Sequence, residues 1–264
     1  MARSGTTTEA ASSPAEVYDA LAPIYDGVGG AQSFAMMVAE RLERLLALRR
    51  PQPAPADALS ILDLGCGTGT LLCALRALHP GWRLAGVDVS AGMLAVAWGK
   101  PGSDGVLWVR ARLPGPLPFT ERFDVVGAFY DTLNHLPDLD ALAAAFRTAA
   151  ALLHPGGLLV FDLNNAFGFE TWWRYRVALD VEDHRIDTAL GYDRHARLAH
   201  AAIGIARGGV ERRFLLHQRC FSEAEVEGAL FRAGFTPEVA APWGPVDPDS
   251  PSKTWFVAAK KHQE

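Results

Sequence analysis

The sequence predicts an α/β protein built on an open, mostly parallel sheet. Apolar runs of strand length alternate with helical segments between residues 60 and 163, which is the pattern of strand–helix–strand units. A glycine-rich turn follows the first apolar run, where a strand gives way to a helix. Helical segments precede this core, and a stretch without helical periodicity follows it. We therefore expect an N-terminal helical cap and an antiparallel lid around the sheet.

Composition narrows the class of protein. The chain has 264 residues, of which 49% are hydrophobic, and a net charge of −5, which argues against a protein that binds nucleic acid through phosphate contacts. Neither a signal-peptide core nor a bilayer-length apolar stretch is evident, and the three cysteines lack metal-ligand spacing. We expect a cytoplasmic monomer or homodimer with no metal, nucleic-acid partner or membrane partner.

The chain divides into five predicted parts. Residues 1–13 are small and polar and are expected to form a disordered tail. A helix begins at Pro14, and a second, at 34–48, has apolar residues at helical spacing before prolines end it. The predicted parts are the tail (1–13), the helical cap and linker (14–55), the core (56–166), the antiparallel lid (167–220) and the C-terminal part of the core (221–264).

Strands and helices of the core follow from the apolar runs and their turn signals. The predicted strands are 60–64, 83–88, 106–109, 123–129 and 158–163, and the predicted helices are 70–79, 91–98 and 138–153. In the C-terminal part, Ser222 and Glu225 form a capping-box pattern that starts a helix, and 254–260 is the last strand. Gly156 and Gly157 are expected to stop a helix and make a turn.

The glycine turn is the most specific signal in the chain. Gly65, Gly67 and Gly69 permit positive φ and close approach of a ligand, and Thr68 and Thr70 suit the start of the next helix. Asp88 ends the second strand, where an acid can accept hydrogen bonds from ribose hydroxyls. The spacing is G-x-G-x-G, which differs from the dinucleotide pattern G-x-G-x-x-G.

The sequence Asp-Leu-Gly-Cys-Gly-Thr-Gly at 63–69, followed by Val-Asp-Val-Ser at 87–90, resembles the S-adenosylmethionine (SAM) site of class I methyltransferases. This resemblance implies their Rossmann-like fold with a seven-stranded, mostly parallel sheet. It also implies SAM as cofactor and S-adenosylhomocysteine as product, with Asp88 on the ribose. The implied cofactor residues are Tyr25, Asp63, Gly65, Cys66, Gly67, Gly69, Asp88, Val89, Met93, Arg112 and Phe129.

Two segments near the cofactor need separate comment. The run from Tyr18 to Asp26 resembles the Tyr-Asp-x-x-Ala-x-x-Tyr-Asp segment of small-molecule methyltransferases, in which the second tyrosine lies over the cofactor pocket. Tyr25 is therefore a candidate contact, although both tyrosines also suit simple packing. Arg112 stands near where many relatives place an acid for the adenine amino group. Arginine cannot accept a hydrogen bond, so it stacks on the base or a backbone carbonyl reads the amine.

Candidate catalytic residues follow the fourth strand. The run 129–136 places polar side chains at the carboxyl end of a strand, where open α/β sheets bind their ligands. His135 is the best general-base candidate because its ordinary pKa lies near neutrality. Asp131 is expected to approach the acceptor, and Tyr130 to line the methyl region. The alternative for His135 is capping or packing of the next helix.

The predicted lid carries aromatic and basic residues that suit a planar or anionic small molecule. Residues 207–210 read as the tip of a hairpin, and 242–251 as a proline-rich loop. The candidate substrate-binding residues are Asn164, Trp172, Trp173, Arg174, His217 and Trp243.

The expected function is SAM-dependent N- or O-methylation of a small molecule in natural-product or secondary metabolism. One alternative is a protein of this fold that binds SAM but catalyses another reaction, such as a cyclisation. Another is a binding module without catalysis. A nicotinamide-dependent oxidoreductase is disfavoured by the glycine spacing.

Overall fold

The structure is a computed structural model that describes residues 11–28, 30–49, 59–244 and 251–261. Residues 1–10 of the predicted tail (1–13), 50–55 of the predicted linker and 245–250 of the predicted loop (242–251) lie outside the described residues. In chain order the elements are α1 (Pro14–Leu21), η1 (Ala22–Gly27), α2 (Ala31–Arg49), β1 (Ser60–Leu64), α3 (Thr70–Leu78), β2 (Arg83–Asp88), α4 (Ala91–Gly99), β3 (Val106–Arg110), β4 (Phe123–Ala128), η2 (Thr132–His135), α5 (Leu139–Leu152), β5 (Leu153–Asn164), α6 (Ala166–Trp172), β6 (Arg176–Val181), β7 (His184–Asp193), β8 (Leu198–Arg207), β9 (Val210–Arg219), α7 (Glu223–Arg232), β10 (Phe235–Trp243) and β11 (Lys253–Lys260).

A seven-stranded sheet forms the centre of the molecule, in the order β10-β11-β5-β4-β1-β2-β3. The five strands from β5 to β3 run parallel, and β11 pairs antiparallel with both β5 and β10. The predicted fold class is therefore confirmed. The strand order reverses between β1 and β4, which is the place where such sheets bind ligands beyond the carboxyl ends of the strands.

Two strands differ from the sequence prediction. β5 begins at Leu153, so Gly156, at φ +76°, lies within the strand and does not follow a helix as a separate turn. β10 was not predicted, and Pro242 and Trp243 belong to it instead of to a loop. β10 is an edge strand with a register shift between Pro237 and Val239, and an edge tolerates proline because no neighbour requires its missing N–H.

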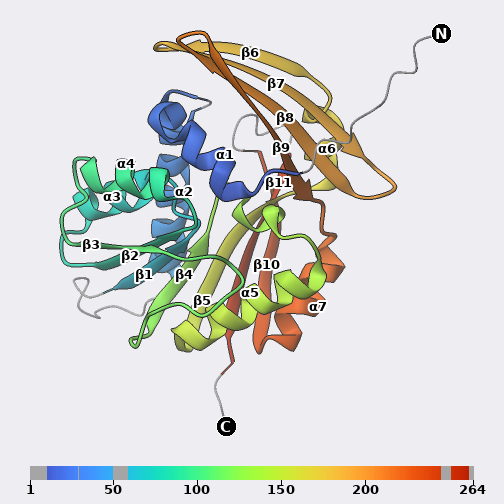
Figure 1. Ribbon diagram of the computed structural model, residues 1–264. Helices are drawn as coiled ribbons and strands as arrows, with labels where there is room; N and C mark the ends of the chain where they lie inside the picture. Colours follow the sequence, from blue (N-terminus) through green and yellow to red (C-terminus); the bar gives the residue numbers. More distant parts are fainter. Residues whose placement is uncertain (1–10, 29, 50–58, 245–250, 262–264) are drawn as a thin grey trace.

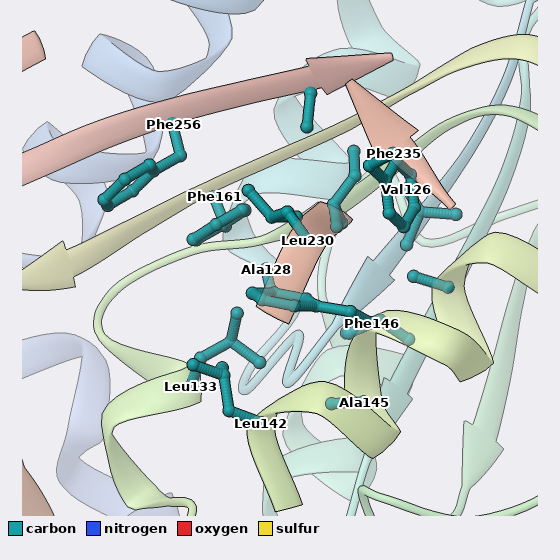
Figure 2. Packing of buried hydrophobic residues seen from close by; sticks show 14 of the residues in the cluster. Val126, Ala128, Leu133, Leu142, Ala145, Phe146, Phe161, Leu230, Phe235 and Phe256 are labelled. Atoms are coloured by element: carbon teal, nitrogen blue, oxygen red, sulfur yellow. The ribbon is translucent and has the colours of Figure 1, made fainter. Parts of the chain in front are cut away.

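Two layers of helices bury the two faces of this sheet. On one face, α5 and α7 pack against the sheet around Phe146, Phe161, Leu230 and Phe256, as Figure 2 shows. On the other, α2 and α3 contribute Val38, Leu42 and Leu72 to a second cluster. These buried clusters hold the carboxyl ends of the strands in fixed positions, which is what a binding site at that edge requires.

The antiparallel lid is a second sheet, in the order β6-β7-β8-β9, which arches over α1 (Figure 1). Its hairpin tip is Gly208-Gly209 with both φ positive and Arg207 paired with Val210, as predicted. The lid packs Ile203 and Phe214 against Val17 and Met93 of the helices below. No helix of the described residues is long and apolar enough to cross a bilayer.

Capping explains where α1 and α7 begin. Ser13 and Glu16 form a capping box at α1, and Ser222 and Glu225 form the predicted one at α7. The ordered chain starts before Pro14, because the backbone N–H of Ser12 donates to the carbonyl of Leu215 in β9 at 2.8 Å. The N-terminal segment is thus attached to the antiparallel lid as well as to the core.

Candidate active site

The glycine turn has the backbone that its sequence requires. Gly65, Gly67 and Gly69 all have positive φ, at +76°, +54° and +73°. A Cβ on Gly65 would lie 2.4 Å from Thr132, whereas a Cβ on Gly67 would meet nothing within 4 Å. The backbone of Gly67 therefore borders open space, which lets a ligand approach it closely.

Two cavities flank this turn, and Gly65 and Gly67 line both of them. The larger has a volume of about 320 Å³ and is lined by Pro14, Tyr18, Gly65, Gly67, Val87, Asp88, Val89, Met93, Ala111, Arg112, Leu113, Thr132, Leu133, His135, Leu136 and Pro137. The smaller has a volume of about 60 Å³ and is lined by Tyr25, Phe34, Ala35, Val38, Asp63, Gly65, Cys66, Gly67, Thr68, Thr70, Leu71, Phe129 and Tyr130.

Asp88 presents its carboxylate at the larger cavity. One oxygen accepts the N–H of Gly67 at 2.9 Å and the other accepts the N–H of Ser90 at 2.8 Å. Burial raises the pKa of Asp88, and these backbone donors oppose the shift. A carboxylate has about four acceptor positions, so two remain for a ligand such as a pair of ribose hydroxyls.

Asp63 presents a buried carboxyl at the smaller cavity. It is 4% exposed, and its Oδ1 has no hydrogen-bond partner among the described residues. Burial, with the nearby charges of Asp88 and Asp162, raises the pKa of Asp63 to about 8. An unpartnered buried oxygen is costly, and an ammonium group would satisfy it. The two cavities thus fit the two polar ends of SAM, its ribose and its amino acid.

Two aspartates of the Tyr-Asp segment support the two loops beside the cavities. These cofactor loops are the glycine turn at 65–70 and the segment at 89–92 that follows β2. Asp19 accepts hydrogen bonds from the Ser90 hydroxyl at 2.6 Å and from the backbone N–H of Gly92 at 2.8 Å. Asp26 accepts from the Thr68 hydroxyl at 2.6 Å and from Lys100 at 2.6 Å. Burial opposes the charge on each carboxylate, but these donors outweigh it and lower both pKa values.

This arrangement corrects the expected role of the threonines. The N-cap of α3 is Gly69, which has no side chain to cap the helix. Thr68 and Thr70 direct their hydroxyls toward Asp26 instead, at 2.6 and 3.4 Å. The start of α3 is therefore stabilised by Asp26 of η1. This residue is more than 40 positions away in the sequence, so a local pattern could not predict the contact.

Tyr18 and His135 form a pair at the larger cavity. The Tyr18 hydroxyl lies 2.9 Å from Nε2 of His135, and the amide nitrogen of Gln218 lies 3.3 Å from the same atom. Since an amide nitrogen only donates, these partners assign Nε2 as an acceptor and place the ring proton on Nδ1. Burial lowers the pKa of His135 despite the opposing effect of Asp131, so the ring is neutral.

A buried ionic group supports the loop that carries His135. Lys253 lies 2.8 Å from Asp131 and 2.8 Å from Asp162, which is fully buried. Asp162 also accepts the backbone N–H groups of Tyr130 at 2.7 Å and Asp131 at 3.1 Å. Both residues have left-handed backbones, with φ of +58° and +54°, which non-glycine residues rarely adopt. The carboxylate of Asp162 therefore stabilises a strained turn beside the site.

Most predicted cofactor residues meet at the two cavities, whereas most predicted substrate residues lie elsewhere. Val89, Met93 and Arg112 line the larger cavity, and Tyr25, Cys66, Phe129 and Tyr130 line the smaller. Gly69 lines neither cavity; it is the N-cap of α3, where a Cβ would lie 2.4 Å from Trp108. Asp131 lines neither cavity, and its carboxylate accepts hydrogen bonds from Lys253 and Gln218.

None of the six predicted substrate residues is among the described lining residues of the two cavities. Trp172 is 43% exposed, and Trp173 packs on Phe169. Arg174 bonds the Tyr175 hydroxyl, and Trp243 lies between Phe34 and Trp255. His217 is paired with His200 in the antiparallel lid. Asn164, the sixth, donates to Gln218 at 3.0 Å and so contacts the residue that bonds His135.

Sequence reasoning missed five residues that shape the site: Asp19, Asp26, Asp162, Gln218 and Lys253. Asp19 and Asp26 could have been found from the sequence, because each directly follows a tyrosine of the Tyr-Asp segment. Asp162 carried a weaker signal, an acid inside an apolar strand. Gln218 and Lys253 carried none, since only the fold brings them to the site.

Comparisons with known proteins give a family match, a relative by sequence and two similar solved structures. Residues 61–157 match a family model described as a methyltransferase domain. The "Putative methyltransferase GWCH70_2453" of Geobacillus sp. (strain WCH70) is 30% identical over 213 residues, which cover 77% of this chain and 85% of that protein. The sugar N-methyltransferase KedS8 from Streptoalloteichus sp. has a TM-score of 0.72 at 26% identity, covering 99% of each chain. An S-adenosylmethionine-dependent methyltransferase from Clostridium acetobutylicum has the same fold, with a TM-score of 0.71 at 20% identity over 93% of this chain and 100% of that one.

Proposed function

Because this chain belongs to the S-adenosylmethionine-dependent methyltransferases, we propose that it methylates a nitrogen or oxygen atom of a small molecule. The observation that carries the proposal is the Tyr18–His135 pair, which lines the same cavity as Asp88. A cavity of about 320 Å³ suits a small acceptor better than a folded protein or a nucleic acid.

The cofactor would be held by residues already described. Asp88 would bind the ribose hydroxyls, Asp63 the ammonium of the amino acid, and the backbone of Gly65 and Gly67 would lie against the chain between them. Bound SAM supplies a methyl group that its sulfonium has already activated. The chain itself orients the acceptor, excludes water and manages one proton.

Tyr18 and His135 provide a route for that proton. A hydroxyl or ammonium acceptor must lose a proton before or during methylation. Neutral His135 accepts the hydrogen bond of Tyr18 at Nε2, so Tyr18 has lone pairs left to accept a proton from the acceptor while it passes its own to the ring. Burial, with Asp131 and Asp88 nearby, raises the pKa of Tyr18, so the tyrosine enters the reaction as a neutral phenol.

The similarity to KedS8 supports a sugar-like amine as the acceptor, because that protein is a sugar N-methyltransferase and aligns over nearly the whole chain. The direct test is transfer of labelled methyl from SAM to a panel of small amines, amino sugars and phenols, analysed by mass. Labelling of proteins or RNA in place of any small molecule would overturn the proposal. A product that forms only with SAM but gains no methyl would point to another reaction.

SAM binding is expected to release a proton at pH 7. With a pKa of about 8, Asp63 is mostly protonated before binding, and pairing with an ammonium requires its carboxylate form. Calorimetric titration in phosphate and in Tris at pH 7 measures the release, because the two buffers differ in ionisation enthalpy. Asp63→Asn has no proton to lose, so its heat should not depend on the buffer. Buffer-independent heat in the unmodified protein would contradict the assignment.

Tyr18→Phe and His135→Asn are each expected to lower kcat by roughly 100-fold, which is typical for loss of a positioned acid or base. The double variant should cost little more than either one, because the two residues act in one path. In the unmodified enzyme the rate should fall as the pH drops through the lowered pKa of His135, since protonated Nε2 cannot accept. Tyr175→Phe, at a 46% exposed tyrosine, is the matched control. If the losses of kcat were additive in the double variant, the two residues would not act in one proton path.

A further inference from the structure

We propose that Gln218, a residue of the antiparallel lid, is a positioning residue that fixes the tautomer of His135. The inference rests on the proposed function, in which Nε2 of His135 receives a proton from Tyr18. Gln218 is 4% exposed and is not among the described lining residues of the two cavities. It therefore acts through the ring of His135 and not on the acceptor itself.

The groups around Nε2 decide which neutral tautomer His135 adopts. The Tyr18 hydroxyl lies 2.9 Å from this atom, and the amide nitrogen of Gln218 lies 3.3 Å from it. A hydroxyl donates or accepts, so Tyr18 is compatible with either tautomer, whereas an amide nitrogen only donates. Gln218 therefore selects the tautomer with a lone pair at Nε2. Nδ1 is buried without a hydrogen bond to a described residue, and a backbone group of His217 favours a proton on the ring.

A buried lysine fixes the direction in which the amide of Gln218 points. The Lys253 ammonium donates to the Asp131 carboxylate at 2.8 Å. A carboxylate only accepts, so the atom of Gln218 that faces Asp131 is the amide nitrogen. At the other end of the amide, Asn164 donates to Oε1 of Gln218 at 3.0 Å. The amide cannot turn over without losing both bonds, so its nitrogen stays directed at His135.

This chain of hydrogen bonds crosses from the antiparallel lid to the core. Gln218 lies in β9 of the lid, and His135 lies in η2 of the core. The Asn134 side chain joins the same two elements, because its amide donates to the carbonyl of Arg219 at 2.8 Å. The lid strand β9 therefore completes the proton path, and the path exists only while β9 lies against η2.

The test is the nitrogen-15 chemical shift of Nε2 in His135, measured by NMR on the intact protein without ligands and assigned by its absence in His135→Asn. In the unmodified protein the shift should be that of an unprotonated imidazole nitrogen. Gln218→Glu replaces the donor by an acceptor and keeps an oxygen for Asn164. Nε2 should then carry a proton, and kcat should fall by roughly 100-fold with unchanged SAM affinity, as for loss of the base. Gln32→Glu makes the same change at an exposed residue and should alter neither quantity.

Asp131→Asn tests the same chain with Gln218 intact. Lys253 needs an oxygen at residue 131, so the new amide turns its nitrogen to Gln218, which must then present its oxygen to both neighbours. Nε2 should again gain a proton. Burial lowers the pKa of His135 and the charge of Asp131 opposes this, so loss of that charge alone would instead disfavour a proton on the ring. Asparagine tolerates the left-handed backbone at residue 131, so this variant is expected to fold.

The outcomes separate this proposal from the proposed function. A proton at Nε2 in the unmodified protein overturns the tautomer assignment, and so does an unprotonated Nε2 in either folded variant. A loss of kcat without a change at Nε2 also overturns it, because Gln218 would then have a purely structural role. If the shifts behave as expected but no small molecule is methylated, the role of Gln218 toward His135 holds and the proposed function fails.

Discussion

Asp88→Asn is expected to weaken SAM binding by about 100-fold or more. The variant replaces an acceptor-only carboxylate by an amide whose nitrogen donates, and Gly67 and Ser90 already present N–H groups to both positions. One ribose hydroxyl therefore loses its acceptor and the turn loses one of its own bonds. The bond of the turn is absent in the free variant too, so the cost to binding arises at the ribose alone. Hydrogen bonds to a charged group contribute about 1.5–3 kcal/mol each, so the loss of one ribose bond and of the charge on the acceptor of the other costs about 3 kcal/mol. Equilibrium dialysis or calorimetry with SAM measures the loss.

The stability of the Asp88→Asn variant is expected to change little, because removal of a buried charge offsets the hydrogen bond that the turn loses. Burial raises the pKa of Asp88 above its ordinary value, which means that its charge disfavours the folded state above the ordinary carboxyl pKa. At neutral pH the melting temperature should therefore stay nearly unchanged, even as affinity falls. Asp104→Asn, at an exposed loop residue, is the control for charge alone. Unchanged SAM affinity in Asp88→Asn would show that the ribose lies elsewhere.

Lys253→Met is expected to destabilise the fold by about 3–5 kcal/mol, the usual cost of breaking a buried ionic group by removing one partner. Burial opposes the charge of Lys253, but Asp131 and Asp162 outweigh it and raise its pKa. Without the ammonium, two carboxylates face each other beside the left-handed turn at Tyr130 and Asp131. In a chain of this size the loss corresponds to a fall in melting temperature of roughly 10 °C, measured by scanning calorimetry.

Lys260 offers a matched control in the same strand. It is also buried, at 9% exposed, but its ammonium donates to the carbonyl of Leu153 and no ion pair is recorded for it among the described residues. Lys260→Met should therefore cost only about 1 kcal/mol, the range of a single hydrogen bond. Similar melting temperatures for the two variants would show that the Lys253 group contributes no special stability.

The core and the cofactor loops could be predicted because their signals are local. β1, the glycine turn and Asp88 lie within one strand–helix–strand unit, and the spacing of a few residues determines the geometry of the turn. The starts of the helices at Pro14 and Glu223 could also be predicted from local sequence. Each has a capping box, which involves residues only three positions apart. Contacts between residues that are close in sequence could therefore be predicted, and contacts between distant residues could not.

The ionic group shows why the rest could not be predicted. Lys253 lies opposite Asn164 in the antiparallel pairing of β11 with β5, and Asp162 lies opposite Trp255. Lys253 and Asp162 are therefore diagonal neighbours on one face of the sheet, a relation set by register and invisible in the sequence. β10 was missed for a different reason, because its prolines indicate a loop unless the strand is known to be at an edge.

The segment α1–η1 has a consequence for how the enzyme can be shortened or recombined. It supplies Tyr18 to the larger cavity, Asp19 and Asp26 to the two cofactor loops, and Val17 to the contact with the antiparallel lid. The family model, by contrast, covers only 61–157. A fragment trimmed to that match would keep the glycine turn and His135, but it would lose Asp19 and Asp26, which support the loops, and Tyr18, the hydrogen-bond partner of His135. We therefore expect the core at 61–157 to be inactive when it is transferred alone. Chimeras should exchange the N-terminal segment together with the loops that it supports.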